Sequence, residues 1–124
     1  MTAGPQSVQV FGRKDSRDTQ RARRFFLERR IPVAFVDLAS RPMAPTELRR
    51  FAERLGAEAL VDREGRRYQE LGLAWLKLDE DEWLTRLLAE PGLLRLPLVR
   101  RGRAFVAGPD EAAWRALLED RADQ

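Results

Sequence analysis

The first third of the chain alternates between strand-like and helix-like patterns of apolar residues. Ser7–Phe11 predicts a strand, and from Asp18 onward the apolar positions recur at helical spacing until Pro32 ends the helix. The apolar run Val33–Leu38 then predicts a second strand, buried on both faces. A strand, a helix and a strand within roughly 30 residues indicate a βαβ unit with parallel strands.

The middle of the chain predicts helices and no strands. One helix lies between Pro45 and Gly56, and residues 62–72 predict short helical turns because their pattern is less regular. Asp79–Glu90 is a clear amphipathic helix, closed by Pro91-Gly92. Its apolar stripe consists of Trp83, Leu84, Leu87 and Leu88.

The last third predicts two strands and a helix. Leu98–Arg100 and Ala104–Ala107 are short strands joined by a tight turn at Arg101-Gly102. A final helix starts at Pro109-Asp110, with Ala113, Trp114, Leu117 and Leu118 facing inward. The order βαβ, helical insert, ββα is that of a thioredoxin-like α/β fold with a four-stranded mixed sheet. We expect one domain over residues 1–124, with the insert at about residues 44–91.

The composition excludes several kinds of chemistry. The sequence contains no cysteine and no histidine, which excludes thiolate nucleophiles, Cys/His zinc sites and a histidine general base. We expect no metal and no cofactor. Of the 23 basic residues 21 are arginine, and asparagine is absent. A thermophilic source and a high-GC coding bias explain this composition equally well.

The net charge of +3 is too small to indicate nucleic-acid binding. No apolar run reaches the ~20 residues of a membrane span, and Met1–Ser7 lacks the features of a signal peptide. A cytoplasmic protein without membrane contact is therefore expected. The charge is uneven, because Arg13–Arg30 holds eight basic and three acidic residues, whereas Asp79–Glu90 holds five acidic and one basic residue. Solvated helix faces explain both runs more simply than binding patches do.

Four segments together resemble the ArsC/Spx family, the arsenate reductase-like branch of the thioredoxin fold. They follow one another in the expected order and cover most of the chain: Phe11–Ala22, Tyr68–Leu73, Pro91–Val99 and Gly108–Trp114. In this family, the reductases attack arsenate with a cysteine in the first loop and regenerate the thiol with glutathione and glutaredoxin. Spx-like members bind the C-terminal domain of the RNA polymerase α subunit and regulate transcription.

The sequence departs from the family pattern at two chemical positions. Ser16 occupies the position of the cysteine, and Leu96 that of an arginine that binds the oxyanion in the reductases. Arg95 is adjacent to Leu96, but neighbours in an extended segment point to opposite faces. The resemblance also implies a cis peptide bond before Pro97, since thioredoxin-fold proteins carry a cis-proline there.

The first loop has two interpretations. Ser16, Arg17 and Thr19 lie at the start of a predicted helix, where free N–H groups favour an anion, so together with Arg95 they are the anion-binding candidates. Alternatively, Ser16 or Asp18 is a simple helix N-cap, which we favour. Ser16 is a poor nucleophile without a histidine base, and a serine ester supplies no sulfur to reduce arsenate.

Two functional hypotheses remain. In the first, the chain is a non-catalytic ArsC/Spx-like module that binds a protein partner, by analogy the RNA polymerase α subunit. In the second, it is an oxyanion-binding or enzymatic domain that retained the loop around Ser16 without thiol chemistry. The tryptophans do not discriminate between them, because we expect Trp75, Trp83 and Trp114 all to be packing residues.

Overall fold

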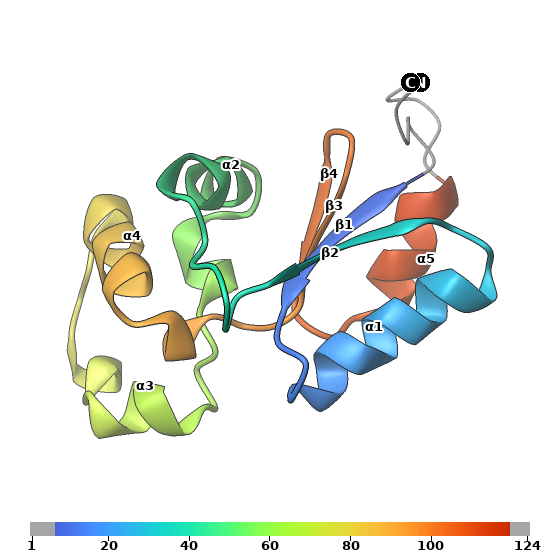
Figure 1. Ribbon diagram of the computed structural model, residues 1–124. Helices are drawn as coiled ribbons and strands as arrows, with labels where there is room; N and C mark the ends of the chain where they lie inside the picture. The colour runs from blue at the N-terminus through green and yellow to red at the C-terminus, as the bar shows by residue number, and fades with distance from the viewer. Residues whose placement is uncertain (1–6, 120–124) are drawn as a thin grey trace. The chain divides into compact units, whose positions relative to one another are not determined.

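A computed structural model describes residues 7–119 and divides the chain into two compact units. Unit 1 comprises the chain up to Arg41 and from Leu96 onward, and unit 2 is Pro42–Arg95. The predicted helical insert lies within unit 2. Figure 1 shows the elements of both units.

Unit 1 is built on a four-stranded mixed sheet with the order β2-β1-β3-β4. Strand β1 (Val8–Gly12) pairs in parallel with β2 (Val33–Asp37) and antiparallel with β3 (Leu98–Arg101), which forms a hairpin with β4 (Ala104–Ala107). The hairpin turns at Gly102, whose φ of 61° is readily adopted by glycine. The predicted α/β class and mixed sheet are confirmed.

Two helices cover one face of this sheet, α1 (Arg17–Glu28) and α5 (Glu111–Glu119), as Figure 1 shows. The core beneath them is apolar because alternate residues of β1 and β3 point to the same side. It contains Val8, Val10, Ala22, Phe25, Phe26, Val99, Trp114 and Leu117. The Trp114 ring centroid lies 5.5 Å from that of Phe25, so the two helices share one aromatic cluster.

The prediction that the second strand is buried on both faces is wrong. β2 is an edge strand, and none of its residues is fully buried. Phe35 packs against the core of unit 1, and the Arg23 guanidinium lies 4.0 Å from the Phe35 ring centroid. An apolar run indicates how hydrophobic a strand is but not its place in the sheet.

Unit 2 is helical, as expected. It contains α2 (Pro45–Leu55), α3 (Arg66–Glu70) and α4 (Glu80–Ala89), with 3₁₀ turns η2 (Ala57–Leu60), η3 (Leu73–Trp75) and η4 (Pro91–Leu93). Its buried side chains include Leu48, Phe51, Leu60, Leu73, Trp83, Leu87 and Leu93. Across residues 7–119, none of the helices combines the length and hydrophobicity of a membrane span.

Polar contacts join the turns of unit 2 to its helices. The Glu80 carboxylate accepts a hydrogen bond of 2.8 Å from the Ala57 N–H, and the Arg67 Nε donates one of 2.8 Å to Glu90. A backbone bond of 2.8 Å runs from the Arg95 N–H to the Leu60 carbonyl. The two side-chain contacts fix both ends of α4 within the unit.

The prediction that Trp75 and Leu88 lie in the interior is wrong. Trp75 is 90% exposed instead of packed, and Leu88 is 40% exposed although the helical stripe placed it inside. Trp83 and Trp114 are buried as expected. A tryptophan as exposed as Trp75 is unusual, because this residue is highly buried on average.

Candidate functional site

The loop between β1 and α1 contains Ser16, which the resemblance described above places at the cysteine position of the family. Ser16 is the N-cap of α1, and its Oγ accepts a hydrogen bond of 3.1 Å from the Thr19 N–H. The Ser16 N–H in turn donates to the Arg13 carbonyl at 3.0 Å. The interpretation of Ser16 as a helix cap is therefore confirmed, and its hydroxyl lone pairs are partly used for that purpose.

Thr19 anchors the loop to the end of β1. Its side chain is fully buried, and its Oγ1 accepts a hydrogen bond of 3.4 Å from the Arg13 N–H. Gly12 leaves the space for this contact, since a Cβ at Gly12 would overlap both the hydroxyl and the methyl group of Thr19. The loop therefore depends on a glycine and a threonine that pack directly against each other.

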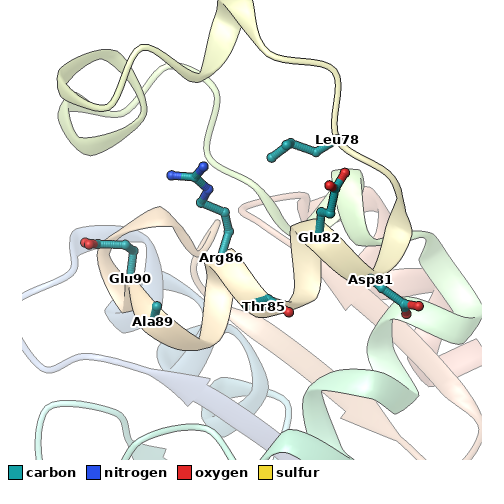
Figure 2. Close-up of a pocket in the computed structure, with 7 residues that line it drawn as sticks. All are labelled: Leu78, Asp81, Glu82, Thr85, Arg86, Ala89 and Glu90. Carbon is teal, nitrogen blue, oxygen red and sulfur yellow. The ribbon is translucent and has the colours of Figure 1, made fainter.

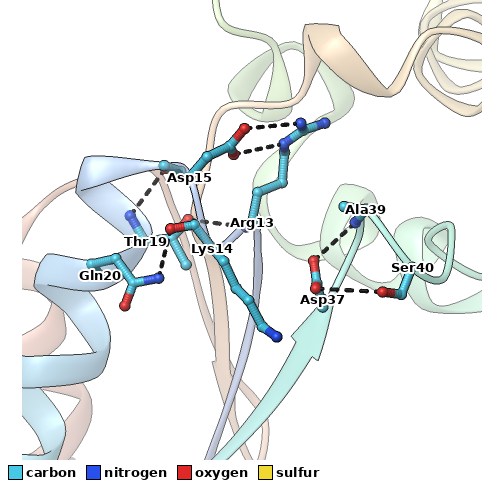
Figure 3. A network of polar contacts seen from close by, with 9 residues as sticks. Arg13, Lys14, Asp15, Thr19, Gln20, Asp37, Ala39 and Ser40 are labelled. Carbon is cyan, nitrogen blue, oxygen red and sulfur yellow. Dashed lines mark hydrogen bonds and ion pairs between the residues drawn. The ribbon is translucent and has the colours of Figure 1, made fainter.

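Arg13 and Asp15 in the loop form an ion pair (Figure 3). Arg13 forms a bidentate contact with Asp15, with Nε and Nη2 at 3.0 and 3.1 Å from the two carboxylate oxygens. The hydrogen bond and charge of Arg13 lower the pKa of Asp15, and Asp15 likewise raises the pKa of Arg13. A carboxylate with a lowered pKa is a weaker base, so Asp15 is poorly suited to activate Ser16.

A second polar turn follows strand β2, which pairs with β1 in the sheet. The Asp37 carboxylate accepts from the Ala39 N–H at 3.0 Å and from the Ser40 hydroxyl at 3.5 Å (Figure 3). The Leu38 N–H donates to the Gly12 carbonyl at 2.8 Å, which continues the parallel ladder. Asp37 thus stabilises its own turn, an Asx-type arrangement that needs no ligand.

The structure brings three of the four anion-binding candidates together. Ser16, Arg17 and Thr19 share the first turn of α1, but Thr19 is buried and only Arg17 extends into solvent. Arg95 belongs to unit 2, where its side chain lines a groove with Glu58, Asp62, Arg63 and Glu64. The Leu96–Pro97 peptide bond is cis, the isomer expected from the resemblance.

The described residues contain neither the thiol nor the imidazole group that nucleophilic chemistry in proteins often uses. The sequence has no cysteine, and no group of three or more metal-ligating side chains occurs among residues 7–119. Ser16 has no histidine to accept its proton. The loop forms a helix cap around Ser16, and its polar side chains bond within the loop.

Sequence reasoning missed a groove that runs along α4 in unit 2 (Figure 2). The groove has a volume of about 470 Å³ and is lined by Leu78, Asp81, Glu82, Thr85, Arg86, Ala89 and Glu90. Two rows at i, i+4 spacing share one side of the helix, namely Asp81, Thr85 and Ala89 beside Glu82, Arg86 and Glu90, and Leu78 precedes the helix. That spacing was visible in the sequence, but the apolar stripe of the same helix is the stronger signal and indicates only the buried side.

Comparison with known proteins agrees with this architecture. The ArsC family model matches residues 11–117. The YffB protein has a structure with a TM-score of 0.82 and 23% identity, over 90% of this chain and 99% of its own. An ArsC-family related protein from Bacteroides fragilis gives a TM-score of 0.81 and 19% identity, over 92% and 99%.

An arsenate reductase from Vibrio cholerae has a TM-score of 0.76 and 18% identity, over 94% of this chain and 98% of its own. No curated protein matches the sequence. The predicted thioredoxin-like fold is confirmed by these structures. With a family model that covers nearly the whole chain, the protein belongs to the ArsC family, as a member that has no cysteine.

Proposed function

We propose that this chain is a non-catalytic module of the ArsC family that acts by binding a protein partner. The observation that carries the proposal is that the sequence has no cysteine and that the Ser16 side chain caps α1. Without a thiol the chain has no sulfur to reduce arsenate, and it has no histidine to act as the base for serine chemistry. Binding a protein partner, in contrast, requires only an exposed surface and no reactive side chain.

By analogy with the Spx-like members, the proposed partner is the C-terminal domain of the RNA polymerase α subunit. The experiment has two arms. In the first, the pure protein is incubated with arsenate, glutathione and glutaredoxin, and NADPH oxidation is followed through glutathione reductase. In the second, the tagged protein and the purified α-subunit domain are tested for binding by size-exclusion chromatography. We expect no turnover above a blank without protein, and a co-eluting complex.

The alternative function is that of an oxyanion-binding domain. It is favoured by one observation, that the N–H groups of Arg17 and Asp18 begin a 12-residue helix without a hydrogen-bond partner among the described residues. A single thiol introduced by Ser16→Cys tests it by absorbance titration near 240 nm, because no other thiol is present. A pKa well below ~8.5 supports an anion-stabilising loop, and a pKa at or above that value removes the alternative.

A further inference from the structure

We propose that the surface formed by Trp75, Leu76 and the groove along α4, called here the α4 surface, binds a basic, arginine-containing segment of a partner protein. This inference rests on the proposed function and deepens it, because it names the surface and the chemistry of the partner. Both parts of the surface lie within unit 2, so the proposed site requires no contribution from unit 1.

The first observation is a concentration of exposed apolar side chains. Among residues 7–119, the large hydrophobic side chains that stand clearly in solvent are Leu27, Trp75, Leu76 and Leu88. Three of these four lie within the 14 residues from Trp75 to Leu88. Single exposed apolar residues are ordinary on protein surfaces, so the adjacent pair Trp75 and Leu76 is the more informative observation.

Trp75 is held in its exposed position by the backbone. It ends the turn η3, where its N–H donates to the Gly72 carbonyl at 3.2 Å and the Leu76 N–H donates to the Leu73 carbonyl at 3.1 Å. Leu73 is 1% exposed and anchors the turn in the core of unit 2. The Trp75 ring therefore projects from a fixed turn, which reduces the entropy that a binding partner must offset.

The groove along α4 begins close to Trp75. Leu78 lines the groove and is three residues after Trp75, a distance that the chain spans in at most about 10 Å. In Figure 2, Leu78 lies over α4 with Glu82 and Arg86 pointing toward it, while Asp81 and Glu90 extend at the two ends. The small side chains of Thr85 and Ala89 leave the space between these longer ones.

The charge of the segment around the α4 surface indicates which kind of partner it can bind. Residues 75–90 contain five acidic side chains and two basic ones, a net charge of 2 − 5 = −3 in a chain whose net charge is +3. Four of these five carboxylates are bonded within unit 2. Asp79 and Glu82 form a capping box with bonds of 2.8 Å, Glu80 accepts from the Ala57 N–H, and Glu90 pairs with Arg67. Asp81 is exposed and has no ion-pair partner in the part of the chain that the structure describes.

These features together fit an arginine-containing segment. A guanidinium group stacks on an indole ring and also pairs with carboxylates, so Trp75 and Asp81 are suited to the same type of side chain. A neighbouring apolar residue of the partner would occupy the groove of about 470 Å³. Nucleic acids and anionic membranes are repelled by the same acidic residues, which leaves a basic protein segment as the occupant.

The test uses three short fluorescein-labelled peptides that share their leucine positions and differ only in the residues between them, which are arginine, glutamine or glutamate. Binding to the full chain is measured by fluorescence anisotropy at low and at physiological salt. We expect the arginine peptide alone to bind, with weaker binding at the higher salt concentration. Trp75→Ala should weaken it about tenfold or more, as for an interface anchor, and Asp81→Arg should abolish it.

Leu27→Ala is the matched control, because Leu27 is another exposed apolar residue and lies in unit 1. It should leave binding unchanged. Trp75→Ala is expected to fold normally, which circular dichroism verifies. The proposal is overturned if all three peptides bind equally, if none binds, or if Trp75→Ala and Leu27→Ala bind the arginine peptide equally well.

Three further outcomes separate this inference from the proposed function. If the α-subunit domain binds Trp75→Ala as well as the wild-type chain, the α4 surface is not the docking site and the module function stands. If sedimentation shows that the wild-type chain self-associates and that Trp75→Ala is monomeric, the occupant is a second copy and this inference is overturned. If the arginine peptide binds through Trp75 and the α-subunit domain does not bind, the inference holds and the proposed partner is wrong.

Discussion

The loop around Ser16 and the α4 surface differ in how their groups are satisfied. In the loop, the Ser16 hydroxyl caps α1, the Thr19 hydroxyl is buried against Gly12, and Arg13 is paired with Asp15. On the α4 surface, the Trp75 ring is 90% exposed and Asp81 has no ion-pair partner among residues 7–119. The side chains of Ser16, Thr19, Arg13 and Asp15 in the first region are bonded to one another or to the loop backbone, whereas Trp75 and Asp81 in the second region present unused apolar area and charge.

The contrast indicates where function is to be sought in an ArsC-family member that has no cysteine. The loop retains a role in stability, because its contacts hold the start of α1 on the end of β1. Trp75 on the α4 surface has no comparable role, because removing its exposed ring costs the fold little. Substitutions in the two regions should therefore have opposite effects on stability and on binding.

The largest expected effect is a difference in stability between alanine variants of two tryptophans, Trp114 and Trp75. Trp114 is fully buried against Phe25 and Phe26, so Trp114→Ala should lower the free energy of unfolding by about 3–5 kcal/mol. Trp75→Ala should change it by less than about 0.5 kcal/mol, because the ring is exposed. Urea denaturation of both variants measures the difference. A Trp75→Ala variant as unstable as Trp114→Ala would show that Trp75 packs in the protein and cannot reach a partner.

The next effect tests whether the loop is as tightly packed as described. Gly12→Ala places a Cβ against the buried Thr19 side chain, and such overpacking should cost about 1–3 kcal/mol. Gly92→Ala is the matched control, since its Cβ would meet only the Arg67 side chain at 3.7 Å. Thermal unfolding should be shifted strongly by the first substitution and little by the second. Equal shifts would mean that Gly12 does not pack closely against Thr19.

A smaller effect tests the assignment of Ser16 as a helix cap. Ser16→Ala removes the acceptor for the Thr19 N–H and should cost about 1 kcal/mol. Ser16→Asn restores an acceptor at the same position, so its stability should stay close to that of the wild-type chain. Both are measured by urea denaturation. If alanine and asparagine are equally stable, the hydroxyl does not contribute through capping.

The smallest effect concerns pH and the ion pair at the end of the α4 surface. The hydrogen bond from Arg67 lowers the pKa of Glu90. A carboxyl whose pKa is lowered in the folded state adds stability above its unfolded pKa of about 4.5, and this contribution is lost as the pH falls through the folded pKa. Glu90→Gln should therefore flatten the acid side of the stability curve.

Glu28→Gln provides the control for this titration, since Glu28 is an exposed carboxylate on α1 without a described ion pair. Urea midpoints measured between pH 3 and pH 7 should converge for the wild-type and Glu90→Gln chains only at the acid end. Parallel curves over the whole range would contradict the assigned ion pair.

Most of the fold was predictable, because hydrophobic periodicity and turn residues act locally. The helix of residues 79–90 was visible from its apolar spacing, and the hairpin at Gly102 from its flanking strands. The edge position of β2 was not predictable, since an apolar run does not reveal which strands pair on either side. The exposure of Trp75 was missed because residues 71–78 have no regular pattern that assigns a face.

The candidate site was predictable in part. Both Ser16 and Asp18 are residues that cap helices, and only the hydrogen bond to the Thr19 N–H identifies the cap. The pairing of Arg13 with Asp15 was also hidden, since two charged residues in a loop adopt contacts that no sequence period encodes. The groove along α4 depends on small side chains at Thr85 and Ala89, which carry no motif.

A calorimetric titration decides whether the loop or the α4 surface carries the function. The C-terminal domain of the RNA polymerase α subunit is titrated into three chains, namely wild type, Ser16→Ala and Trp75→Ala. We expect the wild-type chain and Ser16→Ala to bind with equal affinity, and Trp75→Ala to bind about tenfold or more weakly. Binding that is lost in Ser16→Ala and unchanged in Trp75→Ala would place the function at the loop and contradict the proposed role of the α4 surface.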